Sequence, residues 1–287
     1  MTRSAFTIVE VLVSLTVIGL LMSLIVPAVQ SARGSARLAD CRNRLKQVGL
    51  AIHTVQDSKQ HVSCDIHVLY HYGLGVPGYD PSSIAVGRSG TSLLQCPADP
   101  NTMIGRDSSY EMSNGTQYGT GNGYLSHLST PGVEDFRRIS DFTDGLSQTS
   151  AFSERAIVNE ADQLNPQDDP KKFPAWISMR MTTPGTEPQF IDLCRSPGNS
   201  LAPLRLPHLY RDGYTHMFTP NTTGCWNNAP VNDSSIKAYT PANSFHTGGV
   251  NVLFVDGHVS FVSDSVDAAV WQAVGTINGH EAISSPF

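Results

Sequence analysis

Charge is scarce in this sequence. Only 15% of its 287 residues are Asp, Glu, Lys or Arg, whereas roughly 25% is typical of soluble domains. The 19 basic residues are outnumbered by 25 acidic ones, and the formal net charge is -6. Because nucleic-acid binding needs a basic surface to neutralise phosphates, this balance argues against a nucleic-acid partner. The hydrophobic share of 40% is enough for a real core, in one large domain or two small ones.

The sequence also lacks the short motifs of common catalytic and cofactor sites. It contains no Gly-x-Ser-x-Gly and no His-Glu-x-x-His. The glycine-rich segment SNGTQYGTGNGY, residues 113–124, lacks the Lys-Ser/Thr that ends a phosphate-binding loop. We therefore expect no enzymatic activity and no cofactor. Some acids and bases that could act in catalysis are present without forming a recognised constellation: Glu154, Asp256, His246 and His208.

The cysteines are spread along the chain without a close pair. None forms Cys-x-x-Cys or Cys-x-His, so local spacing predicts no metal site. If the body of the protein is exported, two disulfides and one remaining thiol fit the number; five unpaired buried thiols fit it equally. The sequence does not choose between these alternatives or assign a pairing. The five are Cys41, Cys64, Cys96, Cys194 and Cys225.

Near its start the chain has a long apolar run. Between Phe6 and Val29 the only charged residue is Glu10. About 20 apolar residues suffice for a helix to cross a bilayer, whereas the apolar region of a cleaved secretory signal has roughly 7–15. The run therefore predicts a transmembrane helix. A carboxylate in such a helix calls for a partner, which an α-amino group created by cleavage before Phe6 would supply.

The segment RSAFTIVEVLVSLTVIGLLMSLIVPAVQSAR resembles the N-terminus of type IV pilins and type II secretion pseudopilins. The resemblance implies that a prepilin peptidase removes a leader, residues 1–5, between Ala5 and Phe6. It also implies that Glu10, the fifth mature residue, pairs with the N-terminal amine of a like or related pilin subunit during assembly. Pro27 stands at the twenty-second mature position, as in that family, and we expect it to kink or loosen the helix. Ala5 departs from the usual glycine.

The basic residues on the two sides of this apolar run predict a membrane topology opposite to that of pilins. Only Arg3 and the amino terminus precede it, whereas five basic residues follow it, and the positive-inside rule would place the body in the cytoplasm. The resemblance implies an N-terminus in the cytoplasm and a head in the periplasm or at the cell surface, anchored by one span in the cytoplasmic (inner) membrane. We give the motif more weight than the count. The five basic residues that follow the run are Arg33, Arg37, Arg42, Arg44 and Lys46.

The helix is expected to continue beyond the membrane as an amphipathic segment, residues 30–57. Its apolar stripe recurs at spacings of three and four, which is typical of one helix face packed on a core. The stripe comprises Leu38, Cys41, Leu45, Val48, Ile52 and Val55. His53 is interpreted as a surface histidine of this helix.

Three segments resemble the DUF1559 family. They are CRNRLKQVGLAIH from Cys41 to His53, CPADPN from 96 to 101, and DFTDGLSQTSAFSER from 141 to 155. A fourth segment, SFHTGGVNVLFVDGHVSFVSDSVD, carries the H-x9-D-G motif of prepilin-type processing-associated proteins, with His246 as the histidine and Asp256-Gly257 as the pair. His246, Asp256 and Gly257 either bind a ligand, with His258 as a further donor to a metal, or have only structural roles.

Short apolar runs in the body predict strands. They occur at 67–74, 91–97, 150–158 and 175–181. In the fourth segment, VNVLFV predicts a strand buried on both faces, Asp256-Gly257 a type I′ turn, and HVSFVS the returning strand. A short helix should follow, capped by Asp264 or Ser265 with Asp267 in its first turn.

These observations predict an α+β, pilin-like fold. A long N-terminal spine helix, with a membrane half at 6–29 and the amphipathic half, should pack on a mainly antiparallel sheet head with long loops, residues 58–287. The function expected is that of a membrane-anchored structural or interaction protein processed by prepilin peptidase. The alternative is a membrane-tethered binding module for carbohydrate or another envelope component that forms no filament. In that case exposed aromatic residues would stack on the ligand: Tyr118, Tyr124, Trp176, Tyr210, Tyr214 and Trp226.

Overall fold

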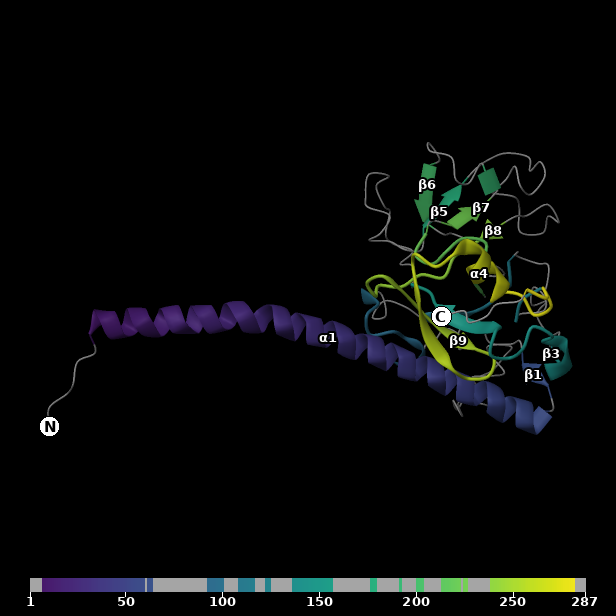
Figure 1. Cartoon of the computed structure of the whole chain (residues 1–287), viewed down its shortest axis with the longest axis horizontal. Helices are drawn as coiled ribbons and strands as arrows, with labels where there is room; N and C mark the ends of the chain where they lie inside the picture. The colour runs from purple at the N-terminus through teal and green to yellow at the C-terminus, as the bar shows by residue number, and fades with distance from the viewer. Residues whose placement is uncertain are drawn as a thin grey trace, which may run out of the picture.

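A computed structural model shows one long helix with a head packed on its C-terminal half (Figure 1). The residues described are 7–59, 61–63, 92–100, 108–116, 122–124, 136–156, 176–179, 191–192, 200–203, 213–222, 224–226 and 238–281.

Helix α1 spans Ile8–Lys59, 52 residues, with Pro27 inside it. At 1.5 Å per residue it is about 78 Å long. The predicted spine helix is confirmed, and it ends two residues beyond the predicted segment 30–57. Figure 1 shows a continuous ribbon that bends gently between its free half and the head. One missing backbone bond at a proline does not end a helix whose neighbouring turns remain bonded.

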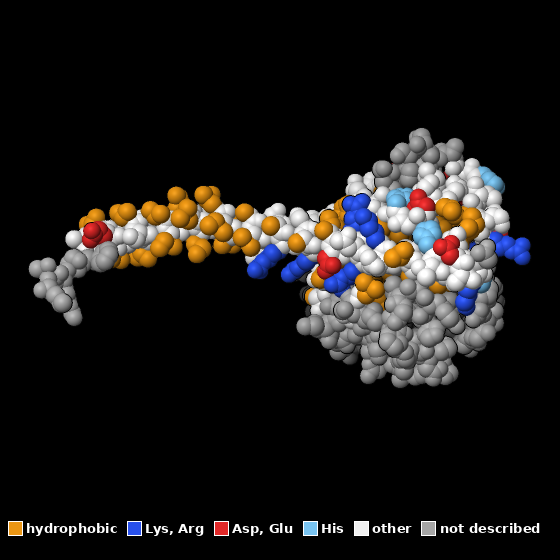
Figure 2. Space-filling view, turned by 90° about the horizontal axis from the view of Figure 1, so that it is seen from below, with side chains coloured by type: hydrophobic (Ala, Val, Ile, Leu, Met, Phe, Trp, Pro, Cys, Tyr) orange, Lys and Arg blue, Asp and Glu red, His pale blue; other side chains and the backbone are white. Residues whose placement is uncertain are grey.

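The two halves of α1 have different surroundings. From Ile8 to Val29 the side chains are exposed, and this part is long and apolar enough to cross a membrane. Figure 2 shows hydrophobic side chains along it and basic side chains where it nears the head. In the docked half the apolar stripe is buried as predicted, at Cys41, Leu45, Val48, Ile52 and Val55, with Leu38 half-buried.

The central sheet of the head has the strand order β10-β9-β4-β2 and is antiparallel throughout. Its strands are β2 (Tyr110–Met112), β4 (Ser150–Glu154), β9 (Gly249–Phe254) and β10 (Val259–Ser263). All six residues of β9 are buried, which confirms the prediction of a strand covered on both faces. The antiparallel sheet and the long helix make the protein α+β, as expected.

Strand β9 separates two parts of the core because its side chains alternate between the faces of the sheet. Leu253 packs with the stripe of α1, whereas Val250, Val252 and Phe254 pack with Tyr214 and the last helix. That helix, α4, spans Ala268–Ala273. Its N-cap is Asp267, whose carboxylate accepts bonds from the N–H groups of Ala269 and Val270. The expectation of a cap at Asp264 or Ser265 is therefore wrong, because the helix begins two or three residues later than expected.

A second sheet has the order β6-β5-β7-β8, with β5 and β7 parallel and the other pairs antiparallel. Its strands are β5 (Trp176–Met179), β6 (Ser200–Pro203), β7 (Gly224–Trp226) and β8 (Ala238–Tyr239). Two short strands, β1 (Val62–Ser63) and β3 (Phe136–Arg137), pair antiparallel. The described residues also form the 3-10 helices η2 (Ser92–Leu94) and η4 (Ile139–Asp141).

Three of the predicted strand runs can be compared with these elements. Those at 150–158 and 175–181 contain β4 and β5 and are confirmed. The run at 91–97 is wrong: it holds η2 and then a turn in which Asp99 N donates to Cys96 O at 2.9 Å. Pro97 within that turn has no N–H to give to a strand ladder. The run at 67–74 lies outside the described residues.

The hairpin β9–β10 is confirmed, but its turn differs from the expected type. A type I′ turn needs positive φ at both central residues, and of the pair only Gly257 has one, at 89°. Gly257 N donates to Phe254 O and Phe254 N donates to His258 O, both at 2.9 Å. This is the three-residue loop in which a left-handed glycine follows a tight turn, so Gly257 is required by the backbone.

Candidate functional site

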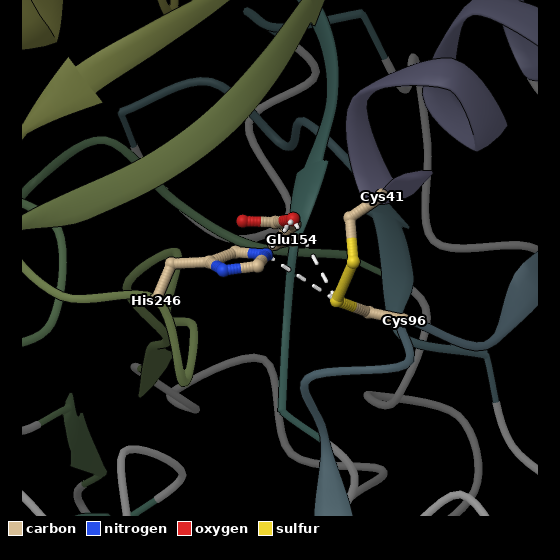
Figure 3. Close-up of side chains that lie close together, drawn as sticks. All are labelled: Cys41, Cys96, Glu154 and His246. Carbon is tan, nitrogen blue, oxygen red and sulfur yellow. Dashed lines mark hydrogen bonds and ion pairs between the residues drawn. A yellow bond between two sulfur atoms is a disulfide. The ribbon is translucent and has the colours of Figure 1, made fainter. Parts of the chain in front are cut away.

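Four side chains from distant parts of the chain meet where the spine helix docks on the head (Figure 3). Cys41 is on α1, Cys96 follows η2, Glu154 ends β4, and His246 lies in the segment before β9. Their sulfur, oxygen and nitrogen atoms all lie within 4.8 Å of one another. We call these four residues the motif cluster, because each comes from a different one of the four segments that carry the family resemblances.

A disulfide joins Cys41 to Cys96, whose Cα atoms are 5.2 Å apart and whose positions are 55 apart in the sequence. It bonds the spine helix covalently to the head. The sequence left disulfides and free thiols open, and for this pair the structure gives the disulfide. Cys64, Cys194 and the side chain of Cys225 lie outside the described residues.

Glu154 brings a buried carboxylate to the disulfide; its side chain is only 2% exposed. Asn251 on the neighbouring strand β9 holds both oxygens. Its backbone N–H donates to Oε2 and its side-chain Nδ2 donates to Oε1, each at 2.9 Å. A buried carboxylate needs such donors, because an unpaired charge in the interior is costly. These bonds also orient the carboxylate before any further group binds to it.

His246 completes the cluster. Its Nε2 lies 3.3 Å from Glu154 Oε1 and 3.5 Å from Cys96 Sγ. In Figure 3 the imidazole points at both groups. In its protonated form His246 would be an ion-pair partner of Glu154, and in either form its Nε2 faces the carboxylate. Its side chain is 6% exposed, so solvent has little access to the contact.

Further contacts tie the same region to α1. The Tyr110 hydroxyl donates to Cys41 O at 3.3 Å, and burial raises the pKa of Tyr110, as does the neighbouring Glu154 carboxylate. Arg44 Nη1 donates to Gln95 O at 2.5 Å, beside Cys96. Arg42 donates through Nε and Nη2 to Val259 O. Two of the basic residues that follow the apolar run thus bind backbone carbonyls of the head.

The structure places His246 and Asp256 at opposite ends of β9 rather than together. The six residues of β9 alone span roughly 16 Å at 3.3 Å per residue. Asp256 Oδ1 lies 2.6 Å from His258 Nδ1 at the hairpin turn. The His258 ring stacks on Phe254. A side chain at Gly257 would come within 3.1 Å of His53 Nε2 on α1, so the turn lies against the spine helix.

At the free end of α1, Glu10 and Thr7 form a reciprocal cap. Thr7 N and Oγ1 donate to Glu10 Oε2 at 2.8 and 2.9 Å, and Glu10 N donates to Thr7 Oγ1 at 3.3 Å. This is the capping-box pattern of a helix start. Glu10 therefore has a structural partner within its own chain. Ala5 and Phe6 lie outside the described residues.

Of the other residues considered from the sequence, those that the structure describes do not join this cluster. Tyr124 and Tyr214 are fully buried, which removes them from a sugar-stacking surface. His208, Tyr118, Tyr210 and the side chains of Trp176 and Trp226 lie outside the described residues.

Sequence reasoning missed that the four resemblance segments contribute to one place. It treated Glu154 as a catalytic candidate without a partner and His246 as a neighbour of Asp256. The available signal was that each separate segment contains at least one cysteine, glutamate or histidine. The positions are 55 to 150 residues apart in the contacts that join them, and no local spacing rule covers such distances.

The model of a family described as a protein of unknown function, DUF1559, matches residues 73–269. No match was found among curated proteins or among solved structures. The matched region holds Cys96, Glu154 and His246, whereas Cys41 precedes it on the spine helix.

Proposed function

The chain belongs to the DUF1559 family, and we propose that it is a pilin-like structural or interaction protein anchored in the cytoplasmic membrane with its head outside the cytoplasm. The observation that carries the proposal is the two-part helix α1. Its N-terminal half is apolar and exposed, and its C-terminal half is buried in the head.

The free half of α1 has the length that a bilayer requires. From Ile8 to Val29 it rises roughly 33 Å at 1.5 Å per residue, against a hydrocarbon core of about 30 Å. Large apolar side chains are exposed over this whole part, including Ile8, Leu15 and Leu24. A bilayer, or the equivalent helices of neighbouring subunits, would cover them.

Two features of the junction between α1 and the head support the placement of the head outside the cytoplasm. The Cys41–Cys96 disulfide is typical of oxidising compartments. Arg42 and Arg44, which weigh toward a cytoplasmic body in the positive-inside count, bind carbonyl groups of Val259 and Gln95. Their presence thus has a structural reason apart from membrane topology.

In this proposal prepilin peptidase cuts between Ala5 and Phe6, and Glu10 acts in assembly. The new N-terminal amine of a neighbouring subunit competes with Thr7 for the Glu10 carboxylate. The ammonium form of that amine carries a full positive charge, which the Thr7 donors lack, so it would form an ion pair with the carboxylate that is stronger in an apolar surrounding than in water. The protein itself performs no catalysis, needs no cofactor and binds no nucleic acid.

Mass spectrometry of the N-terminal peptide, after expression of the full chain with a prepilin peptidase, tests the processing step. We expect the mature chain to begin at an N-methylated Phe6. Ala5→Gly should be cleaved at least as completely, and Ala5→Leu should block cleavage because the pocket before the scissile bond takes a small residue. An intact Met1 in the wild-type chain would defeat the proposal.

Crosslinking between subunits in intact membranes tests assembly. Glu10→Gln should still be cleaved before Phe6 but should lose crosslinks, whereas Ser14→Ala, one turn further along the same helix, should retain them. Equal crosslinking of both variants would show that Glu10 is not needed for assembly, without contradicting the role of α1 as a membrane anchor. A cytoplasm-only reporter fused after Phe287 should be inactive, and its activity would reverse the topology.

A further inference from the structure

We propose that the motif cluster, with Cys41 and Cys96 in their thiol form, binds one divalent metal ion of the zinc type. The donor set would be two thiolates, the Glu154 carboxylate and the His246 imidazole. Zinc takes these ligand types, and four protein donors close a structural site. Local spacing hid the set because no two of the four residues are near each other in the sequence.

The distances already present fit such an ion. With bonds of about 2.0–2.3 Å, the donor atoms of a tetrahedral zinc site are roughly 3.3–3.8 Å apart. Glu154 Oε1 and His246 Nε2 are 3.3 Å apart, Cys96 Sγ and His246 Nε2 3.5 Å, and Cys96 Sγ and Glu154 Oε1 3.9 Å. Two of these distances lie within the range of a tetrahedral site, and the third, from Cys96 Sγ to Glu154 Oε1, exceeds it by about 0.1 Å. When the disulfide is reduced and the two sulfur atoms move apart, Cys41 Sγ can take the fourth corner of the tetrahedron.

The surroundings suit a structural site rather than a catalytic one. Cys41, Cys96 and Glu154 are buried, and the His246 side chain is 6% exposed. The two bonds from Asn251 orient the carboxylate as outer partners of metal ligands do. Four protein donors leave no open position for a water nucleophile. The ion would hold α1 to the head, the same role that the disulfide has in the oxidised form.

The two forms are related by a balanced exchange. A dithiol transfers two electrons and two protons to the disulfide, the S–S bond breaks, both cysteines become thiols, and the dithiol becomes a disulfide. Metal binding then displaces one proton from each thiol. Oxidation by the reverse path releases the ion. A newly made chain, whose cysteines are thiols, reaches the metal-bound form without a reductant.

Titration of the full chain in detergent with Co²⁺ tests the site. The protein is reduced with a phosphine, whose oxidation to the phosphine oxide consumes water. We expect one Co²⁺ per chain, with thiolate-to-cobalt charge-transfer absorption and the intense visible bands of a tetrahedral complex. Zn²⁺ should abolish both signals. Without reduction these bands should be absent, because the sulfurs are bonded to each other.

Variants separate this site from other thiols in the chain. His246→Ala should weaken Co²⁺ binding by more than about 100-fold, beyond the 10–100-fold loss typical of outer partners, and Glu154→Gln should weaken it as well. His258→Ala, a matched change at an exposed histidine, should bind as the wild type does. If reduction unfolds the head, thiols of the unfolded chain would bind Co²⁺ equally in the His246→Ala and His258→Ala variants. That equality, or a reduced wild type without the bands, would overturn the proposal.

Discussion

At the scale of single residues, His216 has the most distinctive surroundings outside the motif cluster. It is fully buried, with Nε2 3.0 Å from Ser150 Oγ and Nδ1 3.4 Å from Ser113 Oγ. Its ring lies against Trp271, with centroids 4.3 Å apart. A serine and a histidine at this distance resemble a nucleophile and its base, but the absence of solvent access to His216 makes the group structural. Burial lowers the pKa of His216 to about 3.

We predict that His216 makes the head sensitive to acid. The pKa of its imidazole is near 6.5 in the unfolded chain and about 3 in the folded chain. Between these pH values the unfolded state binds one proton more than the folded state. The free energy of unfolding is therefore highest above pH 6.5 and decreases as the pH falls below it. From pH 7 to pH 5 the loss should be about 2 kcal/mol, measured by urea denaturation of the full chain in detergent.

Replacement of the histidine isolates its contribution. His216→Gln should be less stable at pH 7, because the cavity was shaped for the ring, but its stability should depend less on pH over this range. If the free energy of unfolding of His216→Gln depends on pH as strongly as that of the wild type, groups other than His216 cause the acid sensitivity.

At the scale of elements, the C-terminal half of the spine helix packs directly on the hairpin β9–β10. Gly49 of α1 lies directly on the hairpin: a Cβ added there would be 3.0 Å from Leu253 Cδ1 and 3.3 Å from Gly257 Cα. Gly34, on the same helix, has nothing within 4 Å of such an atom. Substitutions at these two positions can therefore distinguish the effect of helix propensity, at Gly34, from the effect of packing against the hairpin, at Gly49.

We predict opposite effects of alanine at these positions. Gly34→Ala should strengthen the helix locally by about 0.8–1.0 kcal/mol, seen as slower amide hydrogen exchange in the surrounding turns. Gly49→Ala gains the same propensity but must push the hairpin away, and overpacking typically costs about 1–3 kcal/mol. Its net effect should be a loss of about 1 kcal/mol in urea denaturation. A Gly49→Ala protein more stable than the wild type would show that the hairpin yields easily.

At the scale of the whole molecule, the Cys41–Cys96 disulfide is a covalent crosslink between the anchoring helix and the head, in addition to the polypeptide chain that joins them. Its two residues are 55 positions apart. A loop of this size is expected to lower the entropy of the unfolded chain by an amount worth about 4 kcal/mol. The buried stripe of α1 also packs on the sheet, so the disulfide adds to an apolar interface.

Reduction in the presence of a chelator should therefore lower the free energy of unfolding by about 4 kcal/mol. The comparison uses one sequence in two redox forms, which avoids cavities left by substitution. Urea denaturation of the full chain in detergent gives the difference, and thiol labelling confirms the redox state. A loss below about 1 kcal/mol would mean that the unfolded chain keeps Cys41 and Cys96 near each other. Addition of Zn²⁺ to the reduced form should recover part of the loss if the motif cluster binds the ion.

The sequence by itself determined the features that depend on local periodicity. The apolar run and the stripe from Cys41 to Val55 predicted α1, because helix faces repeat within four residues. The segment around Asp256-Gly257 predicted the hairpin β9–β10 for the same kind of reason. Within these elements local rules failed at the ends: the cap of α4 is Asp267, and the turn after β9 is not type I′. Ends depend on competing contacts of a few residues.

Only the tertiary structure decided which side chains meet. The sheet order β10-β9-β4-β2 places Glu154 beside Asn251 and directs it toward the loop of His246. Docking of α1 then brings Cys41 to Cys96 and closes the cluster. Such contacts join residues 55 to 150 positions apart, and their geometry follows from packing the whole core. The physical reason is that burial of α1 against the sheet, rather than any local preference of these four residues, sets the distances between them.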